Sequence, residues 1–236
     1  CAHSRHARVC VNACETLGIR RYLQMSSTRR FTRFPCPSSR EVIAGEAAIE
    51  ASCLDYTILR PTMIFGGKRD GNLTRLLEWF RKHWWFPLFG TGTSLVQPVF
   101  VEDLLDAMVA ALERPEVTRR RAFTLAGPEP LAYRQMLKEV ARVAGTRRPI
   151  LIPVPFAFAL RIASLLPQWV THRTLSAEQI QRFAEDKHAT IAKAREALEF
   201  SPRSFQTAIE QKAAGEAEIE ALYPGGPTPR ATGGEG

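Results

Sequence analysis

Three consecutive hydroxyl side chains, Ser26, Ser27 and Thr28, stand at the end of the apolar segment 20–26. Hydroxyl groups in such a place can form hydrogen bonds to a polar ligand. They can equally well satisfy backbone groups where a strand ends. The residues alone leave both interpretations open.

A second candidate group, Pro61, Thr62, Met63 and Ile64, follows the apolar segment 56–59. Proline cannot donate to a strand ladder, so the strand is expected to end here and to open into a loop. In an open parallel sheet, ligands bind beyond the carboxyl ends of the strands. These four residues are therefore candidate ligand contacts, and an ordinary exit from a strand is the alternative.

The remaining reactive side chains form no site by their spacing. The five histidines have neither a nucleophile motif nor the spacing of metal ligands. Cys10 and Cys14 would share a helix face, but two further ligands at zinc spacing are missing, so we predict no metal site. We interpret the cysteines as small buried residues. Their odd count of five, without a signal peptide, predicts a reducing, cytoplasmic location.

Strands and helices that could position these side chains alternate through residue 127. The hydrophobic pattern, the turns and the caps predict strands over 20–26, 56–59, 97–101 and 122–126. They predict helices over 9–17, from residue 38, 71–83, 103–113, 133–144, 153–166, 176–185 and 204–222. Ser38 with Glu41 fits a capping box for the second helix. Alternation of this kind is typical of a doubly wound parallel sheet.

The chain divides by composition into a sheet-containing part and a helical part. We predict an α/β domain over 1–127, with an insertion at about 66–96 that belongs to a cap. A mainly helical cap follows over 128–222. The last residues, 223–236, are rich in Pro, Gly and Thr and are expected to be disordered.

Four motifs together resemble those of the extended and atypical short-chain dehydrogenase/reductases, the NAD-dependent epimerase/dehydratase class. They are 54–66 (LDYTILRPTMIFG), 97–104 (QPVFVEDL), 123–130 (FTLAGPEP) and 200–205 (FSPRSF). The resemblance implies a Rossmann-type doubly wound parallel sheet, with its N-terminal part missing, and a small mainly helical substrate cap. It implies NAD or NADP as cofactor, with NADP slightly favoured. By the same resemblance Thr28 would contact substrate, while Ser26, Ser27 and Pro61 to Ile64 would lie against the cofactor.

The chain departs from this family at the residues that do its chemistry. The family carries Tyr-x-x-x-Lys on the helix before the Leu-Arg-Pro strand, with a Glu four residues after the lysine. If Glu46 is that Glu, the lysine position falls on Val42 and the tyrosine position on Ser38. A glycine-rich phosphate loop is also missing, because Gly90-Thr91-Gly92 lacks the third glycine and follows no first strand. Roughly 90 residues of βαβ structure are therefore expected upstream.

Two functions follow from the resemblance and its departures. The first is an NAD(P)-binding oxidoreductase or epimerase-like protein that acts on a small molecule. The alternative is a non-catalytic NAD(P)H-binding structural or sensor protein, similar to the accessory subunit of respiratory complex I that shares the last two motifs. The missing Tyr and Lys favour this alternative.

The charge and the hydropathy of the chain limit the classes of partner that we expect. The net charge is +8 with an isoelectric point near 9.6, but the basic residues are scattered and no nucleic-acid motif is present. The most apolar stretch, 150–170, is interrupted by prolines, which argues against a membrane span. Contact with a membrane surface stays open for this stretch and for the aromatic run Trp79 to Phe86. We therefore expect a small-molecule partner, no nucleic acid and no integral membrane segment, and leave the oligomeric state open.

Overall fold

The computed structural model describes residues 4–67, 70–71, 73–155 and 185–222. The described helices are α1 Ser4–Thr16, α2 Pro37–Glu50, α3 Leu73–Lys82, α4 Val101–Glu113, α5 Pro115–Thr118, α6 Tyr133–Val143, α10 Ala192–Leu198 and α11 Phe205–Leu222, with the 3-10 helix η1 Thr28–Phe31. The strands are β1 Arg21–Met25, β2 Asp55–Pro61, β3 Ile64–Phe65, β4 Trp85–Phe89, β5 Leu95–Val96, β6 Val99–Phe100, β7 Arg121–Leu125, β8 Leu131–Ala132 and β9 Ile150–Val154. The predicted helix over 176–185, apart from its last residue, and the tail over 223–236 lie outside these ranges.

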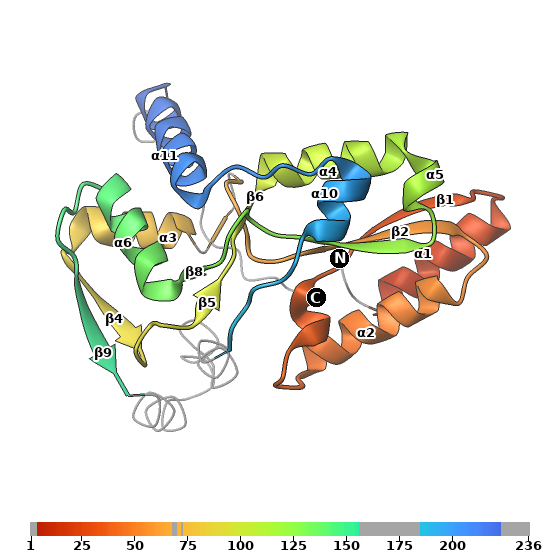
Figure 1. The fold of residues 1–236 in the computed structure, drawn as a ribbon, viewed down its shortest axis with the longest axis horizontal. Helices are drawn as coiled ribbons and strands as arrows, with labels where there is room; N and C mark the ends of the chain where they lie inside the picture. Colours follow the sequence, from red (N-terminus) through yellow and green to blue (C-terminus); the bar gives the residue numbers. More distant parts are fainter. Residues whose placement is uncertain (1–3, 68–69, 72, 156–184, 223–236) are drawn as a thin grey trace.

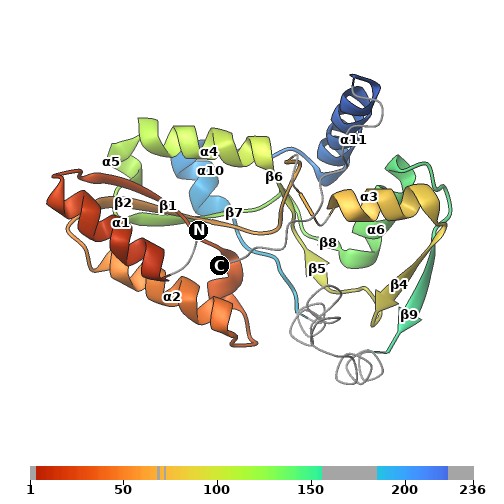
Figure 2. The same ribbon diagram turned by 180° about the vertical axis from the view of Figure 1, so that it is seen from behind.

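A three-stranded parallel sheet, in the order β1-β2-β7, is the centre of the first part of the molecule. Helices α1 and α2 cover one face of this sheet, and α4 and α10 cover the other (Figures 1 and 2). Successive residues of β2 point to opposite faces: Ile58 packs among α1 and α2, and Leu59 packs against α4 and α10. Both are fully buried. The predicted α/β fold with a parallel sheet between two helical layers is confirmed.

The second part of the molecule is built from α3, α6, α11 and the parallel pair β4–β9 (Figure 1). Its core contains Leu77, Phe80, Leu137 and Ile209, all almost fully buried. The core continues through Phe65 and Phe100, which belong to β3 and β6 and connect this part to the sheet. Phe65 also packs against Phe205 of α11, with ring centroids 5.3 Å apart.

Several local predictions are wrong, each for a reason that involves contacts distant in the sequence. The start of the predicted helix over 153–166 is wrong, because Pro153 and Val154 belong to β9, which pairs with β4. The rest of that prediction, from residue 156, lies outside the described residues. The predicted strand over 97–101 is only two residues long, and Val101 already begins α4. Ala192–Leu198 forms a helix that the hydrophobic pattern did not predict. It packs on the sheet, with Leu198 only 3% exposed.

The N-terminus of α2 is capped differently from the prediction. Cys36 is the N-cap, Pro37 is the first helical residue, and Ser39 closes the box, its hydroxyl accepting the Cys36 N–H at 3.1 Å. Glu41 instead accepts hydrogen bonds from the backbone N–H and the hydroxyl of Ser4 on α1. The predicted capping box of Ser38 and Glu41 is therefore wrong, and Glu41 connects two helices.

The strand β1 is an edge strand among the described residues, although its apolar sequence is typical of an inner strand. Its only strand partner in the described part of the chain is β2, which it meets in the register Arg21 to Asp55 through Met25 to Leu59.

The division of the chain at residue 127 into two domains stays a prediction. The structure adds that α10, from beyond that boundary, contributes to the core of the sheet.

Candidate functional site at the carboxyl edge of the sheet

The segments that leave β1, β2 and β7 lie side by side at the carboxyl edge of the sheet. The backbone N–H of Ser26 donates to the Leu59 carbonyl at 2.7 Å, and that of Thr62 donates to the Leu125 carbonyl at 2.9 Å. Because all three strands are parallel, the residues that follow them meet at one edge. The structure therefore brings the two candidate groups, 26–28 and 61–64, together.

Thr28 and Pro61 are in direct contact at this edge. The hydroxyl of Thr28 donates to the Pro61 carbonyl at 3.2 Å, which joins the start of η1 to the end of β2. Thr28 is half-buried. A half-buried hydroxyl at a sheet edge retains acceptor capacity for a ligand.

Ser27 and Ser26 have structural partners. Ser27 is the N-cap of η1, and its hydroxyl accepts the N–H of Arg29 at 3.2 Å. Ser26 is only 6% exposed, and its hydroxyl donates to the carboxylate of Glu46 on α2. For these two serines the geometry favours the satisfaction of local polar groups.

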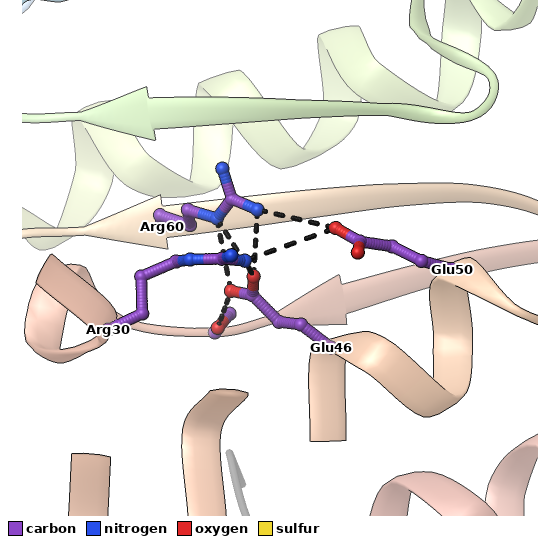
Figure 3. A network of polar contacts seen from close by, with 5 residues as sticks. Arg30, Glu46, Glu50 and Arg60 are labelled. Atoms are coloured by element: carbon purple, nitrogen blue, oxygen red, sulfur yellow. Dashed lines mark hydrogen bonds and ion pairs between the residues drawn. The ribbon is translucent and has the colours of Figure 1, made fainter. Parts of the chain in front are cut away.

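Glu46 is the centre of a buried ionic network that joins η1, α2 and β2 (Figure 3). It is 2% exposed and accepts two hydrogen bonds from the Nε of Arg60, at 3.0 and 3.1 Å, and one from its terminal nitrogen at 2.7 Å. Arg30 of η1 binds the same carboxylate. Glu50, one turn further along α2, lies 3.6 Å from Arg60 and 3.9 Å from Arg30.

An aromatic ring also contributes to stabilising the positive charges of Arg30 and Arg60. The ring of Phe31 lies 5.6 Å from the guanidinium of both Arg30 and Arg60, a distance suited to cation–π contact. Burial lowers the pKa of both arginines from the ordinary value. Because Arg30 and Thr28 lie in the same short helix, this network holds the loop that carries Thr28.

The residues after β2 are held by the segment between β5 and β6. The hydroxyl of Thr62 donates to the carbonyl of Gln97, and the side-chain amide of Gln97 donates to the Gly127 carbonyl at 2.7 Å. The Met63 carbonyl accepts the N–H of Val99 at 2.9 Å. Ile64 pairs with Val99 in the β3–β6 ladder, and 37% of it is exposed. Ile64 is thus accessible at this edge.

A shallow hollow of about 620 Å³ lies beside Gln97 and Gly127. Its lining residues are Gln97, Pro128, Pro130, Ala189, Thr190, Ile191, Ala192, Arg195 and Glu196. The side-chain oxygen of Gln97 accepts the N–H of Ala189 at 2.9 Å, which brings the segment before α10 to this edge. No pattern in the sequence predicts a role for 189–196 at this edge, because their position depends on a contact between residues 92 positions apart.

The tyrosine and lysine positions of the resembled family contain no proton-transfer group. Val42 is 4% exposed and packs in the core beneath Ser26 and Glu46. Ser38 lies beside Cys36, with its hydroxyl 3.1 Å from the thiol sulfur. Tyr22 lies near the amino end of β1, where burial raises its pKa to about 12 and its hydroxyl donates to Gln24. A neutral phenol at that end of the strand does not reach the carboxyl edge.

The described ranges contain neither a cluster of metal-binding side chains nor a membrane-spanning helix. Within them, no group of three or more His, Cys, Asp or Glu side chains is placed to hold a metal ion. The described cysteines Cys10, Cys14, Cys36 and Cys53 are free thiols. None of the helices in the described part of the chain is both long and apolar enough to cross a membrane.

Curated relatives share more than local motifs with this chain. A mitochondrial NADH dehydrogenase [ubiquinone] 1 alpha subcomplex subunit 9 from Arabidopsis thaliana is 31% identical over 163 residues, which is 69% of this chain and 40% of the relative. The subunit of the same name from Mus musculus is 27% identical over 152 residues, which is 63% of this chain and 38% of the relative. The chain thus spans about 40% of the length of these relatives.

Solved structures share the fold at low sequence identity. A UDP-glucuronic acid 4-epimerase from Bacillus cereus, in complex with NAD, matches with a TM-score of 0.68 and 16% identity, over 90% of this chain and 66% of its own. A dTDP-glucose 4,6-dehydratase from Bacillus anthracis, in complex with NAD, matches with a TM-score of 0.68 and 10% identity, over 92% and 68%. The model of the NAD dependent epimerase/dehydratase family matches residues 3–126, more than half of the chain. The chain therefore belongs to the NAD dependent epimerase/dehydratase family.

Proposed function

We propose that this chain forms part of an NAD(P) site, with the nicotinamide end of the cofactor at the carboxyl edge of β1, β2 and β7. One observation carries the proposal: Thr28 and Pro61 meet at this edge, 3.2 Å apart, where open parallel sheets bind ligands. Thr62, Met63 and Ile64 would line the nicotinamide, and Ser26 and Ser27 would hold the loop around it. The relatives solved with bound NAD support the cofactor class.

The role best supported is that of an NAD(P)H-binding structural or sensor protein. Proton relay in the family needs a phenol and an ammonium group beside the nicotinamide. Here these positions are Ser38, beside a cysteine thiol, and Val42, buried in the core. A protein with this pair can position a dinucleotide, but it lacks the relay that turns over a sugar or alcohol.

A second candidate function is an oxidoreductase or epimerase-like activity on a small molecule. The specific observation in its favour is the half-buried hydroxyl of Thr28 at the same edge, placed to contact a substrate. Hydride transfer itself needs little from the protein beyond positioning of the cofactor. The two functions differ in one measurable respect, which is turnover of the reduced cofactor.

NADP is the form that we favour. The net charge of +8 suits the more anionic of the two dinucleotides, although the solved relatives contain NAD.

The proposed location is the cytoplasm, because four free thiols agree with a reducing compartment. Because two relatives are named as subunits of a mitochondrial NADH dehydrogenase [ubiquinone], assembly into a larger complex is a further proposal.

The first test is titration of the natural protein, after its intact mass has been measured, with NADPH and with NADH. Exchange of Ile64→Arg should weaken binding about tenfold or more, because a long charged side chain would occupy the nicotinamide face. The matched control is Ile43→Arg on α2, where the native side chain is 45% exposed and belongs to a helix rather than to a strand exit. Equal loss in both variants, or saturable binding that Ile64→Arg leaves unchanged, would contradict the proposed site.

The second test separates the two functions. NADPH oxidation is followed with a quinone and with an aldehyde as acceptors. If the protein is structural or a sensor, NADPH should bind saturably, and its oxidation should not exceed the rate measured in buffer without the protein. Oxidation that falls in Thr28→Val, with cofactor affinity retained, would instead establish the enzymatic function.

A further inference from the structure

Helices α3 and α6 pack on one face of the two-stranded sheet β4–β9, and exposed side chains lie on its other face. Leu88, Phe86 and Leu151 point into the core formed with α3 and α6. Residues that alternate with them face away from that core. Among these, Ile150 is 51% exposed and Ile152 is 45% exposed.

The end of this sheet carries an exposed tryptophan among basic residues. Trp84, just before β4, is 62% exposed. Its carbonyl accepts the N–H of Ile150 at 2.9 Å, and the Phe80 carbonyl accepts the hydroxyl of Thr146 at 2.7 Å. These two bonds hold the segments 80–84 and 146–150 side by side. We call Trp84, Ile150 and Ile152, with the basic residues Arg81, Lys82, Arg147 and Arg148 from these two segments, the β4–β9 tip.

The charge at the tip has one sign. The segments 79–89 and 145–155 contain four Arg and Lys residues and no Asp or Glu. Lys82, Arg147 and Arg148 are exposed. Arg142, which comes just before the second segment, belongs instead to ion pairs with Glu139 and Glu210 at 2.9 and 2.6 Å. The two segments that form the tip therefore contribute basic residues and no carboxylate.

We propose that the β4–β9 tip docks on an anionic lipid surface. Tryptophan and aliphatic side chains enter the boundary between headgroups and acyl chains, while neighbouring Lys and Arg attract anionic headgroups. A second copy of the chain is a poor occupant, because a two-fold contact through the tip would set its basic residues against each other. The tip lies at the opposite end of the molecule from α1 (Figure 1), so docking leaves that end free.

The experiment measures co-sedimentation of the full chain with two kinds of vesicle: phosphatidylcholine alone, and phosphatidylcholine mixed in equal parts with phosphatidylglycerol. We expect binding to the mixed vesicles, a large loss of that binding at high salt, and little binding to phosphatidylcholine. The double variant Arg147→Glu with Arg148→Glu should reduce the partition coefficient about tenfold or more, since each basic residue contributes about a fivefold factor.

Matched controls separate the tip from the general positive charge of the chain. Arg5→Glu with Arg8→Glu makes the same change of net charge on α1, where both arginines are exposed, and should leave binding within about twofold. Trp84→Ala should weaken binding, and Leu17→Ala, at a side chain 72% exposed on the far end, should not. Circular dichroism of every variant confirms that it is folded. A tip variant that does not fold is replaced by Arg148→Gln.

Three results would overturn the proposal. The first is absence of binding to the mixed vesicles. The others are a loss of binding in the Arg5 and Arg8 control as large as in the tip variant, and equal binding to vesicles with and without anionic lipid. Light scattering of the chain without lipid tests the other occupant. A dimer that Ile152→Ser dissociates would show that the tip is a protein interface, and would also overturn the docking on lipid.

Discussion

At the scale of the residue, the partner of each hydroxyl group depends on whether a buried charged side chain lies within reach. Ser26 and Thr28 are two positions apart, yet Ser26 donates to a buried glutamate, whereas Thr28 contacts a backbone carbonyl at the edge. The difference follows from Glu46, which collects Ser26, Arg30 and Arg60 around one carboxylate. A buried charge must be paired and hydrogen-bonded, so Glu46 determines where its neighbours point.

Glu46→Gln should destabilise the fold strongly. Removal of the carboxylate leaves the guanidinium groups of Arg30 and Arg60 facing each other with only Glu50 nearby, at a cost of about 3 kcal/mol in the free energy of unfolding. Urea unfolding measures the change. Glu50→Gln is the control, since that side chain is 44% exposed and should cost less than about 1 kcal/mol. Equal effects of the two changes would show that Glu46 is not the centre of the network.

At the scale of the element, the exits of the strands are held by close backbone contacts as well as by side chains. Gly127 follows β7, and its carbonyl accepts the amide of Gln97. A Cβ at this glycine would lie 2.4 Å from the Pro98 carbonyl oxygen, which is backbone and has little freedom to move. The absence of a side chain at 127 thus allows the segment after β7 to lie against the one before β6.

Gly127→Ala should therefore separate these two segments and lower stability by about 2 kcal/mol, because the clash is with backbone. Thermal and urea unfolding report the loss, and weaker NADPH binding is expected to accompany it. Gly67→Ala serves as the control: a Cβ there meets no atom within 4 Å, so its effect should stay within about 0.5 kcal/mol. Wild-type stability in Gly127→Ala would mean that the contact is looser than described.

At the scale of the whole molecule, the chain crosses between its two parts more than once. The second part begins with α3 and continues through β4, α6 and β9, but α10 returns to the sheet. There Ala194, Ala197 and Leu198 pack in the same hydrophobic core as Leu104 and Phe123. The sheet consequently depends on residues from near the end of the chain.

Leu198→Ala tests this dependence. The side chain is 3% exposed in the core beside β7, and its truncation should cost about 3 kcal/mol through lost burial and a residual cavity. Leu105→Ala on α4, at a side chain 52% exposed, should change stability by less than about 0.5 kcal/mol. If α10 were only a part of the cap, Leu198→Ala would leave the unfolding of the sheet unchanged.

The sequence by itself determined the fold class, the three strands of the parallel sheet with the helices between them, and the candidate edge residues 26–28 and 61–64; it did not predict the short strands β3, β4 and β5. The predicted features depend on local signals: apolar runs, a proline that ends β2, and the parallel topology that such alternation requires. The buried face of α4 was not among them. Leu105, Val109 and Leu112 are apolar and yet about half exposed, while Leu104, Ala107 and Ala111 are buried in the core against the sheet.

Only the tertiary structure decided which candidates are accessible at the carboxyl edge and which are buried. Ser26 turns to Glu46 twenty positions away, and the hollow beside Gln97 is completed by 189–196. The strand β9 forms because β4 lies beside it, and among the described helices α3 and α6 pack on only one face of this pair. Contacts of this range leave no periodic signal, because the partners are distant in the sequence and each fits several local conformations.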